Sequence, residues 1–174
     1  QIPKTCGPNA YINDGEYAVT SQLQFLSAPG AWYNVKDHTV SLATPPPPKG
    51  RFLAVNVLGN NSRPILYEKK INDIIPNQPI TVEFYATNLL KKTFSGGAGP
   101  NLHVSLVDEN NNVISFFETG TIAKTENWVL YSTKLDPKNN TSLKFIIRSI
   151  ETATGGNDLA IDDISAYQIP KLCT

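Results

Sequence analysis

The feature that most constrains this chain is a succession of short strand patterns separated by polar turns. No stretch repeats apolar residues at helical spacing over three turns, whereas alternation of apolar and polar residues recurs along the chain. The predicted strands cover residues 17–19, 51–57, 65–71, 79–87, 102–107, 113–118, 128–135, 142–150 and 156–164. This series of short strands with polar turns predicts an all-β fold, an antiparallel β-sandwich.

Length and composition fit one domain over residues 1–174. The chain has 174 residues, 40% of them hydrophobic, which is enough for a single sizeable core. Its 15 basic and 15 acidic side chains cancel, whereas a nucleic-acid-binding protein normally has a basic excess. No apolar run approaches the length of a membrane span. The first residues, 1–4, read as internal sequence, so we expect a processed chain or a fragment of a larger protein.

The two cysteines, Cys6 and Cys173, lie near opposite ends of the chain. Neither is in an apolar run or near a histidine, which favours a disulfide that closes the domain over two unrelated free thiols. A disulfide that closes such a long loop would stabilise the fold by about 4–5 kcal/mol in the chain-entropy model. The disulfide implies an oxidising compartment, and it requires the termini to lie side by side, as they do when the first and last strands pair.

A short motif occurs twice. Residues 1–6 read Gln-Ile-Pro-Lys-Thr-Cys, and residues 168–173 read Gln-Ile-Pro-Lys-Leu-Cys. We interpret this recurrence as a tandem array with a period of about 167 residues (168 minus 1), in which each module ends where the next begins. Alternatively, both ends use the same exit sequence independently.

The last predicted strand is acidic. It contains Asp158, Asp162 and Asp163 within six residues. Because side chains alternate along a strand, Asp162 and Asp163 are predicted to point to opposite faces, so that one of them meets the interior or the sheet edge. An isolated buried carboxylate is costly, and a cation coordinated by oxygens removes that cost. The alternative is a set of solvated or backbone-bonded acids without a metal.

Several short motifs together resemble a known group of extracellular domains. They are Trp32 followed by Asp-His-Thr at 37–39, Gly50 before an apolar strand, and the closing Gly-Asn-Asp-Leu-Ala-Ile-Asp-Asp-Ile at 156–164. This order is similar to MAM-type jelly rolls, whose internal cysteine pairs are missing here. It resembles more closely the jelly-roll domains repeated in surface and gliding-motility proteins of the Bacteroidetes. The closing motif also occurs in carbohydrate-binding modules of the jelly-roll type.

The resemblance implies a structural calcium ion beside the final strand. By the resemblance its ligands are Asp162 or Asp163, Glu16 or Asp14, Asp37, and the carbonyl near Lys49. It also implies that Asp-His-Thr is a turn that stabilises the fold, with the His38 imidazole bonded to backbone. Acid–base chemistry at His38 is the weaker alternative.

Three side chains on polar strand faces are candidates for ligand binding: Tyr85, His103 and Arg148. Sugar recognition uses an aromatic ring beside amide and charged groups, and these three are predicted to line one groove. The alternative is an ordinary solvated sheet face.

No catalytic motif is found, and we assign no catalytic residue. We therefore expect a non-enzymatic, calcium-stabilised binding or adhesion module of a secreted or cell-surface protein. Its expected partner is a glycan or a surface protein, with no nucleic acid and no membrane insertion, and with neighbouring domains in the same chain. The alternatives are a structural spacer of a large adhesin and an accessory domain of a secreted hydrolase.

Overall fold

The structure is a computed structural model, and it describes residues 2–3, 12–23, 30–42, 50–59, 63–153 and 155–170. Twelve strands and one short helix occur in these residues. They are β1 (Ile2–Pro3), β2 (Glu16–Thr20), β3 (Gln22–Leu23), β4 (Val35–Lys36), α1 (His38–Leu42), β5 (Phe52–Val55), β6 (Ile65–Ile71), β7 (Ile80–Asn88), β8 (Asn101–Val107), β9 (Val113–Thr121), β10 (Val129–Leu135), β11 (Leu143–Ser149) and β12 (Leu159–Tyr167).

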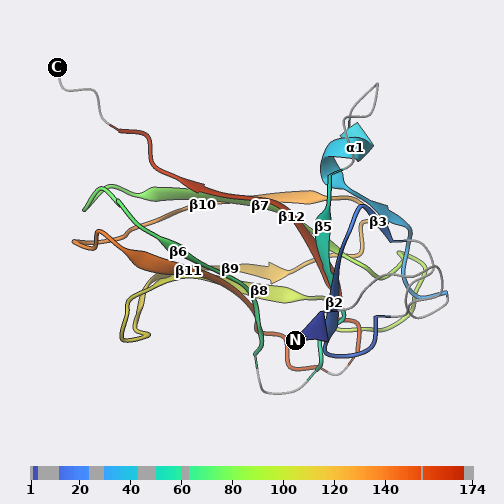
Figure 1. Cartoon of the computed structure of the whole chain (residues 1–174). Coiled ribbons are helices and arrows are strands. Elements are labelled where there is room, and N and C mark those ends of the chain that lie inside the picture. The colour runs from blue at the N-terminus through green and yellow to red at the C-terminus, as the bar shows by residue number, and fades with distance from the viewer. Residues whose placement is uncertain are drawn as a thin grey trace.

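Two sheets face each other and form a sandwich (Figure 1). One has the order β1-β2-β5-β12-β7-β10 and the other the order β6-β11-β8-β9, while β3 and β4 form a small separate ribbon. From β5 to β12 the chain changes sheet at every connection except the β8–β9 hairpin. Eight strands in this order make a jelly roll, and all pairs except β1–β2 are antiparallel. The predicted all-β antiparallel sandwich is confirmed.

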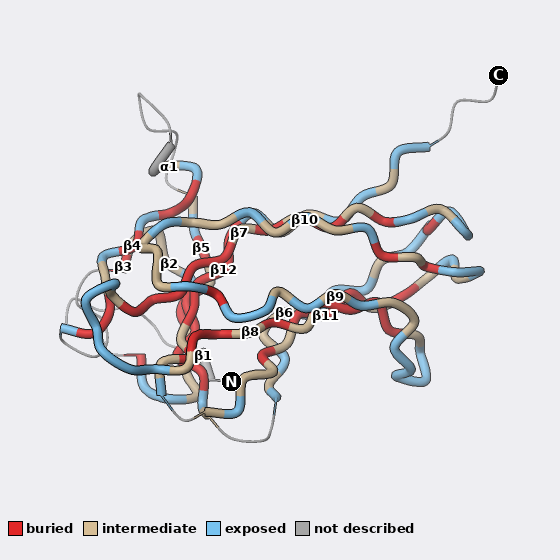
Figure 2. Tube along the Cα trace, turned by 180° about the vertical axis from the view of Figure 1, so that it is seen from behind, coloured by how far each residue is buried: buried red, intermediate tan, exposed pale blue. Residues whose placement is uncertain are grey.

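The core lies between the two sheets, where the buried parts of the chain face one another (Figure 2). It is filled by apolar side chains that the alternation in the sequence predicted to share one face of each strand. Val82 and Phe84 of β7 point inward, and so do Val104 of β8 and Ile147 of β11, each at most 1% exposed. Burying a side chain of this kind stabilises a fold by about 1.5–3 kcal/mol. A second cluster, around Trp32 and Phe52, packs at one end of the six-stranded sheet.

Helix α1 is an element that the strand pattern does not predict. Asp37 precedes it and acts as its N-cap, because Asp37 Oδ1 accepts a hydrogen bond from the backbone N–H of Val40 at 3.2 Å. The helix has five residues, and in the described parts of the chain no helix is long and apolar enough to cross a membrane.

The prediction that the first and last strands pair is wrong. β1 and β12 belong to the same sheet, but β2 and β5 lie between them. The described ends of the chain lie apart in Figure 1. Strand β1 pairs with β2 at the level where β12 begins, whereas residues 168–170 follow the end of β12. Cys6 and Cys173 lie outside the described residues, so the disulfide stays a prediction without the strand pairing that was expected to bring the two cysteines together.

Candidate functional site

Strand β12 contains an irregularity at the acidic motif. Its register with β7 shifts between Asp162 and Ser165, and Asp163 has a φ of +49°. This β-bulge interrupts the alternation of side chains. The prediction that Asp162 and Asp163 point to opposite faces is therefore wrong: both carboxylates reach His38, the first residue of α1.

The N-terminal end of α1 binds both carboxylates. The backbone N–H of His38 donates to Asp162 Oδ2 at 2.9 Å, and Nδ1 of His38 lies 2.8 Å from Asp163 Oδ2. The imidazole also stacks on Tyr85, with ring centroids 3.5 Å apart, and meets the edge of Trp128 at 6.2 Å. In these contacts the His38 ring bonds to a carboxylate, whereas the resemblance implied a bond to a backbone group. The contacts join α1 to β7, to β12 and to Trp128, the residue before β10.

Gly50 is required beside this end of α1 for a steric reason. A Cβ atom at position 50 would lie 2.4 Å and 2.6 Å from the two carboxylate oxygens of Asp37, which is only 2% exposed. Real Cβ atoms essentially never come so close to other heavy atoms. The glycine before β5 therefore lets the backbone approach the buried carboxylate.

The carboxylate of Asp162 has altered acidity. Burial raises the pKa of Asp162 to about 6, against hydrogen bonds from the backbone of His38 and Asp163 that lower it, and the nearby charges of Asp163 and Asp37 raise it further. Both oxygens of Asp162 accept backbone N–H groups, at 2.9 Å from His38 and 2.8 Å from Asp163. Asp162 thus connects the bulge to the first residue of α1.

The six predicted calcium ligands do not meet at one point. Asp37, Asp162 and Asp163 lie together, but Glu16 is at the other end of β2, about 13 Å along the strand from the level of Asp162. Asp14 lies at that same far end, near Asp158. Lys49 is outside the described residues, and in the described segments no group of three or more His, Cys, Asp or Glu side chains is arranged to hold a metal ion. The predicted set does not fit one ion, and calcium stays a prediction.

Asp158 has a separate structural role. Its Oδ2 accepts a hydrogen bond from the indole N–H of Trp32 at 3.1 Å, and its Oδ1 accepts one from the backbone N–H of Val57 at 3.2 Å. Burial raises the pKa of Asp158 to about 6, opposed by these two bonds, while the charge of Asp14 raises it further. Trp32 is 8% exposed, so it anchors a loop and does not offer a binding platform.

The three predicted ligand-binding residues do not line one groove. Tyr85 lies in β7 of the six-stranded sheet, and His38 covers its ring. His103 and Arg148 lie in β8 and β11 of the four-stranded sheet, directly opposite each other in register. The sequence could not predict this separation, because alternation assigns a face to each residue but not the sheet that carries it.

A groove crosses the outer face of the four-stranded sheet and contains the other two predicted residues. This outer groove has a volume of about 650 Å³, and its lining includes Glu68, His103, Glu118, Lys144, Ile146 and Arg148. Its floor is closed, since Ile146, Val107 and Ser105 are at most 5% exposed although they lie on the outer face.

Four polar side chains of the outer groove, His103, Glu118, Lys144 and Arg148, have hydrogen-bond partners in the protein. Nδ1 of His103 lies 3.2 Å from Glu118 Oε1, Lys144 Nζ donates to Asn111 Oδ1 at 2.6 Å, and Arg148 donates to the carbonyl of Arg63 at 3.2 Å. The groove therefore presents donors and acceptors above a buried floor.

Phe116 is a residue of this surface that the sequence predictions missed. It lies in β9 opposite Ser105, its side chain is 59% exposed, and its ring stacks on His103 with centroids 4.9 Å apart. The available signal was the Phe-Phe pair at 116–117, because adjacent residues on a strand must face opposite ways. One of the two rings therefore had to be on the outer face.

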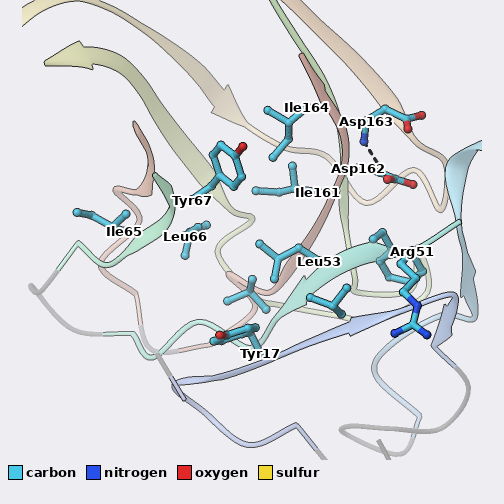
Figure 3. A pocket seen from close by; sticks show the side chains of 13 residues that line it. Tyr17, Arg51, Leu53, Ile65, Leu66, Tyr67, Ile161, Asp162, Asp163 and Ile164 are labelled. Carbon is cyan, nitrogen blue, oxygen red and sulfur yellow. Dashed lines mark hydrogen bonds between the residues drawn. The ribbon is translucent and has the colours of Figure 1, made fainter. Parts of the chain in front are cut away.

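Another cavity, of about 590 Å³, opens at the side of the sandwich where β6 ends the four-stranded sheet. Tyr17, Leu53 and Ile161 reach into it from the six-stranded sheet, and Leu66 and Tyr67 from β6 (Figure 3). The bulge residues Asp162 and Asp163 are at its margin. This cavity is mainly an uncovered part of the core, because the six-stranded sheet is wider than its partner.

Comparison with known proteins shows the fold. No family model matches the chain, and no curated protein matches its sequence. A carbohydrate-binding module described under "CBM4 structure and function" matches with a TM-score of 0.50 and 11% identity over 93% of both chains. A cyclase from Fischerella sp. TAU matches with a TM-score of 0.51 and 13% identity, over 74% of this chain and 68% of the cyclase.

A third match is to part of a much larger protein. This chain spans only 15% of the enzymatically active domain of bacteriophage CBA120 tailspike protein 4, with a TM-score of 0.43 and 13% identity over 68% of this chain. The likenesses to the carbohydrate-binding module and to the cyclase show the fold, a β-sandwich. The resemblance to Bacteroidetes surface domains stays a prediction.

Proposed function

We propose that this chain is a non-catalytic carbohydrate-binding module, with a glycan bound along the outer groove of the four-stranded sheet. The observation that carries the proposal is an exposed aromatic ring, Phe116, stacked on the groove residue His103, beside polar side chains that lie over a buried floor. A sugar offers the same two kinds of surface, since its C–H faces are apolar and its hydroxyls donate and accept hydrogen bonds.

The polar groups of the groove suit a neutral polar ligand. His103 and Glu118 form a donor–acceptor pair, and Lys144 and Arg148 add donors along β11. Because their protein partners hold these side chains, little side-chain entropy is lost when a ligand binds. The ring of Phe116 is fixed in the same way by its stack on His103.

The comparisons support the proposal only at the level of the fold. A carbohydrate-binding module has this sandwich over almost its whole length, but so does much of a cyclase. The experiment must therefore test catalysis as well as binding. We expect the module to belong to a secreted or cell-surface protein, as an adhesion module or an accessory domain of a hydrolase; a pure spacer would bind no glycan.

The test is a screen of the 174-residue chain against a panel of xylo-, cello-, manno- and galacto-oligosaccharides, followed by calorimetry with the best of them. Phe116→Ala and His103→Ala are expected to weaken binding about tenfold, or roughly 1.4 kcal/mol each. Leu130→Ala is the matched control, because Leu130 is a 49% exposed apolar residue in β10 of the other sheet.

The products of the same incubation are then separated by chromatography. Intact oligosaccharide supports a non-catalytic module, and shortened products would contradict it. Binding to none of the oligosaccharides, or equal losses of affinity in Phe116→Ala and Leu130→Ala, would overturn the groove as a glycan site.

A further inference from the structure

The two copies of Gln-Ile-Pro lie at different places on the sandwich. The first copy contains β1, which pairs in parallel with Glu16 and Tyr17 of β2. The second copy, residues 168–170, follows β12 directly. Because β2 and β12 both run antiparallel to β5, strands β1 and β12 run in the same direction. The chain therefore enters and leaves the sandwich along one direction.

The entry and the exit are separated by the length of β12. Tyr17 lies beside Val55, and Val55 lies beside Leu159, so β1 is level with the first residue of β12. From there eight further residues carry the chain to Tyr167, a rise of about 26 Å at about 3.3 Å per residue. A second module beginning at residue 168 would lie beyond the far end of the first.

Gln168 fixes the exit segment to its own module. Its Oε1 accepts a hydrogen bond from the backbone N–H of Ile75 at 2.8 Å, and its Nε2 donates to the carbonyls of Ile75 and Gln78. Gln78 Nε2 in turn donates to the carbonyl of Ile169 at 2.6 Å. The backbone at 168–169 is thus held against the turn between β6 and β7.

The side chain of Ile169 is left without cover. It is 74% exposed, the most exposed of the large apolar side chains described. In the tandem period, Ile169 of one module is Ile2 of the next, the first residue of β1. The exposed residue therefore stands at the position that pairs with β2 in a following copy.

We propose that Gln-Ile-Pro is a shared junction, held to one module by the hydrogen bonds of Gln168 and Gln78 and forming β1 of the next. This inference rests on the proposed tandem array, and it commits the partner to a second copy of this domain. Successive modules stack end to end in one direction with no linker between them, and Ile169 becomes a contact between them. Such an array is a stiff rod that presents one outer groove per module.

The test uses a chain of two modules, in which residues 1–167 are followed directly by residues 1–174. Nitrogen-15 relaxation and small-angle X-ray scattering measure whether the modules tumble together. The expected result is one rotational correlation time, that of a particle of doubled mass. A chain with a short Gly-Ser insertion after residue 167 of the first module gives the reference for independent tumbling.

Gln78→Glu in the first module is the matched variant. It keeps the shape of the side chain and removes the donor to Ile169, and it changes nothing in the shared segment. We expect its correlation time to shorten toward that of the insertion chain. Independent tumbling of the unmodified pair would overturn the shared junction. No effect of Gln78→Glu would overturn the role of the Gln78 side chain in holding it. Glycan binding is measured on the single chain, so the two proposals fail separately.

Discussion

His38 shows how much of the site depends on contacts that are distant in the sequence. Asp-His-Thr was predicted to be a stabilising turn; in the structure Asp37 caps helix α1, and His38 is the first residue of that helix, only 7% exposed. Its partner Asp163 is 125 positions away, and its stacking partner Tyr85 comes from a third element. A motif of three residues predicts a turn but not the partner that meets it.

Gly50 leads to a prediction at the same scale. Gly50→Ala places a methyl group against both carboxylate oxygens of Asp37, so we expect a loss of about 1–3 kcal/mol in unfolding free energy. Gly155→Ala is the control, since a Cβ there meets nothing within 4 Å, and its effect is expected to stay within about 0.5 kcal/mol. Urea denaturation of both variants measures the difference, and equal losses would contradict the close approach at Asp37.

Asp158 makes stability depend on pH. Its pKa is raised to about 6 in the folded chain, so the unfolded chain loses this proton at lower pH. The contribution of Asp158 to the free energy of unfolding is fully present below pH 3.8 and is lost as the pH rises through about 6. Between pH 5 and pH 7.5 the loss from this group is about 1.4 kcal/mol, or roughly 3–6 °C in melting temperature.

Thermal melts across this range check the sign. The chain is expected to melt higher at pH 5 than at pH 7.5, and Asp158→Asn, which cannot titrate, is expected to reduce that difference. A melting temperature that rises from pH 5 to pH 7.5 would contradict a buried carboxylate at Asp158.

At the scale of elements, alternation predicted the strands and failed at the bulge. The strand predicted at residues 65–71 matches β6, and the face assigned to Val82 and Phe84 is the buried one. At β12 the same rule put Asp162 and Asp163 on opposite faces, but Asp163 has a positive φ that turns the chain. Aspartate tolerates this conformation better than most residues, so the sequence shows no glycine there to mark the bulge.

Calcium is tested at this scale. If a calcium ion binds between the N-terminal end of α1 and β12, calcium raises the melting temperature relative to a chelator, because the ion binds the folded state alone. Asp37→Asn is then expected to remove the difference, and Asp14→Asn, at the far end of β2, to keep it. Identical melts with calcium and with chelator would refute a stabilising ion.

At the scale of the whole molecule, the jelly roll follows from strand number and turn spacing, but the sheet that carries each residue does not. Tyr85, His103 and Arg148 were each assigned correctly to an outer or polar face, and the structure puts Tyr85 on the opposite side of the sandwich from the other two. Which strands share a sheet depends on the order in which the chain crosses, and that order involves contacts over many tens of residues. The outer groove is therefore a property of the topology.

The outer groove is tested most directly by mapping where a glycan binds. Nitrogen-15 correlation spectra of the 174-residue chain are recorded while the best oligosaccharide from the panel is added. The predicted result is a set of shifts confined to the four-stranded sheet, centred on His103, Phe116 and Arg148. Shifts centred on the six-stranded sheet around Tyr85 of β7 and on His38, which covers it, with none at the groove, would contradict the proposed site.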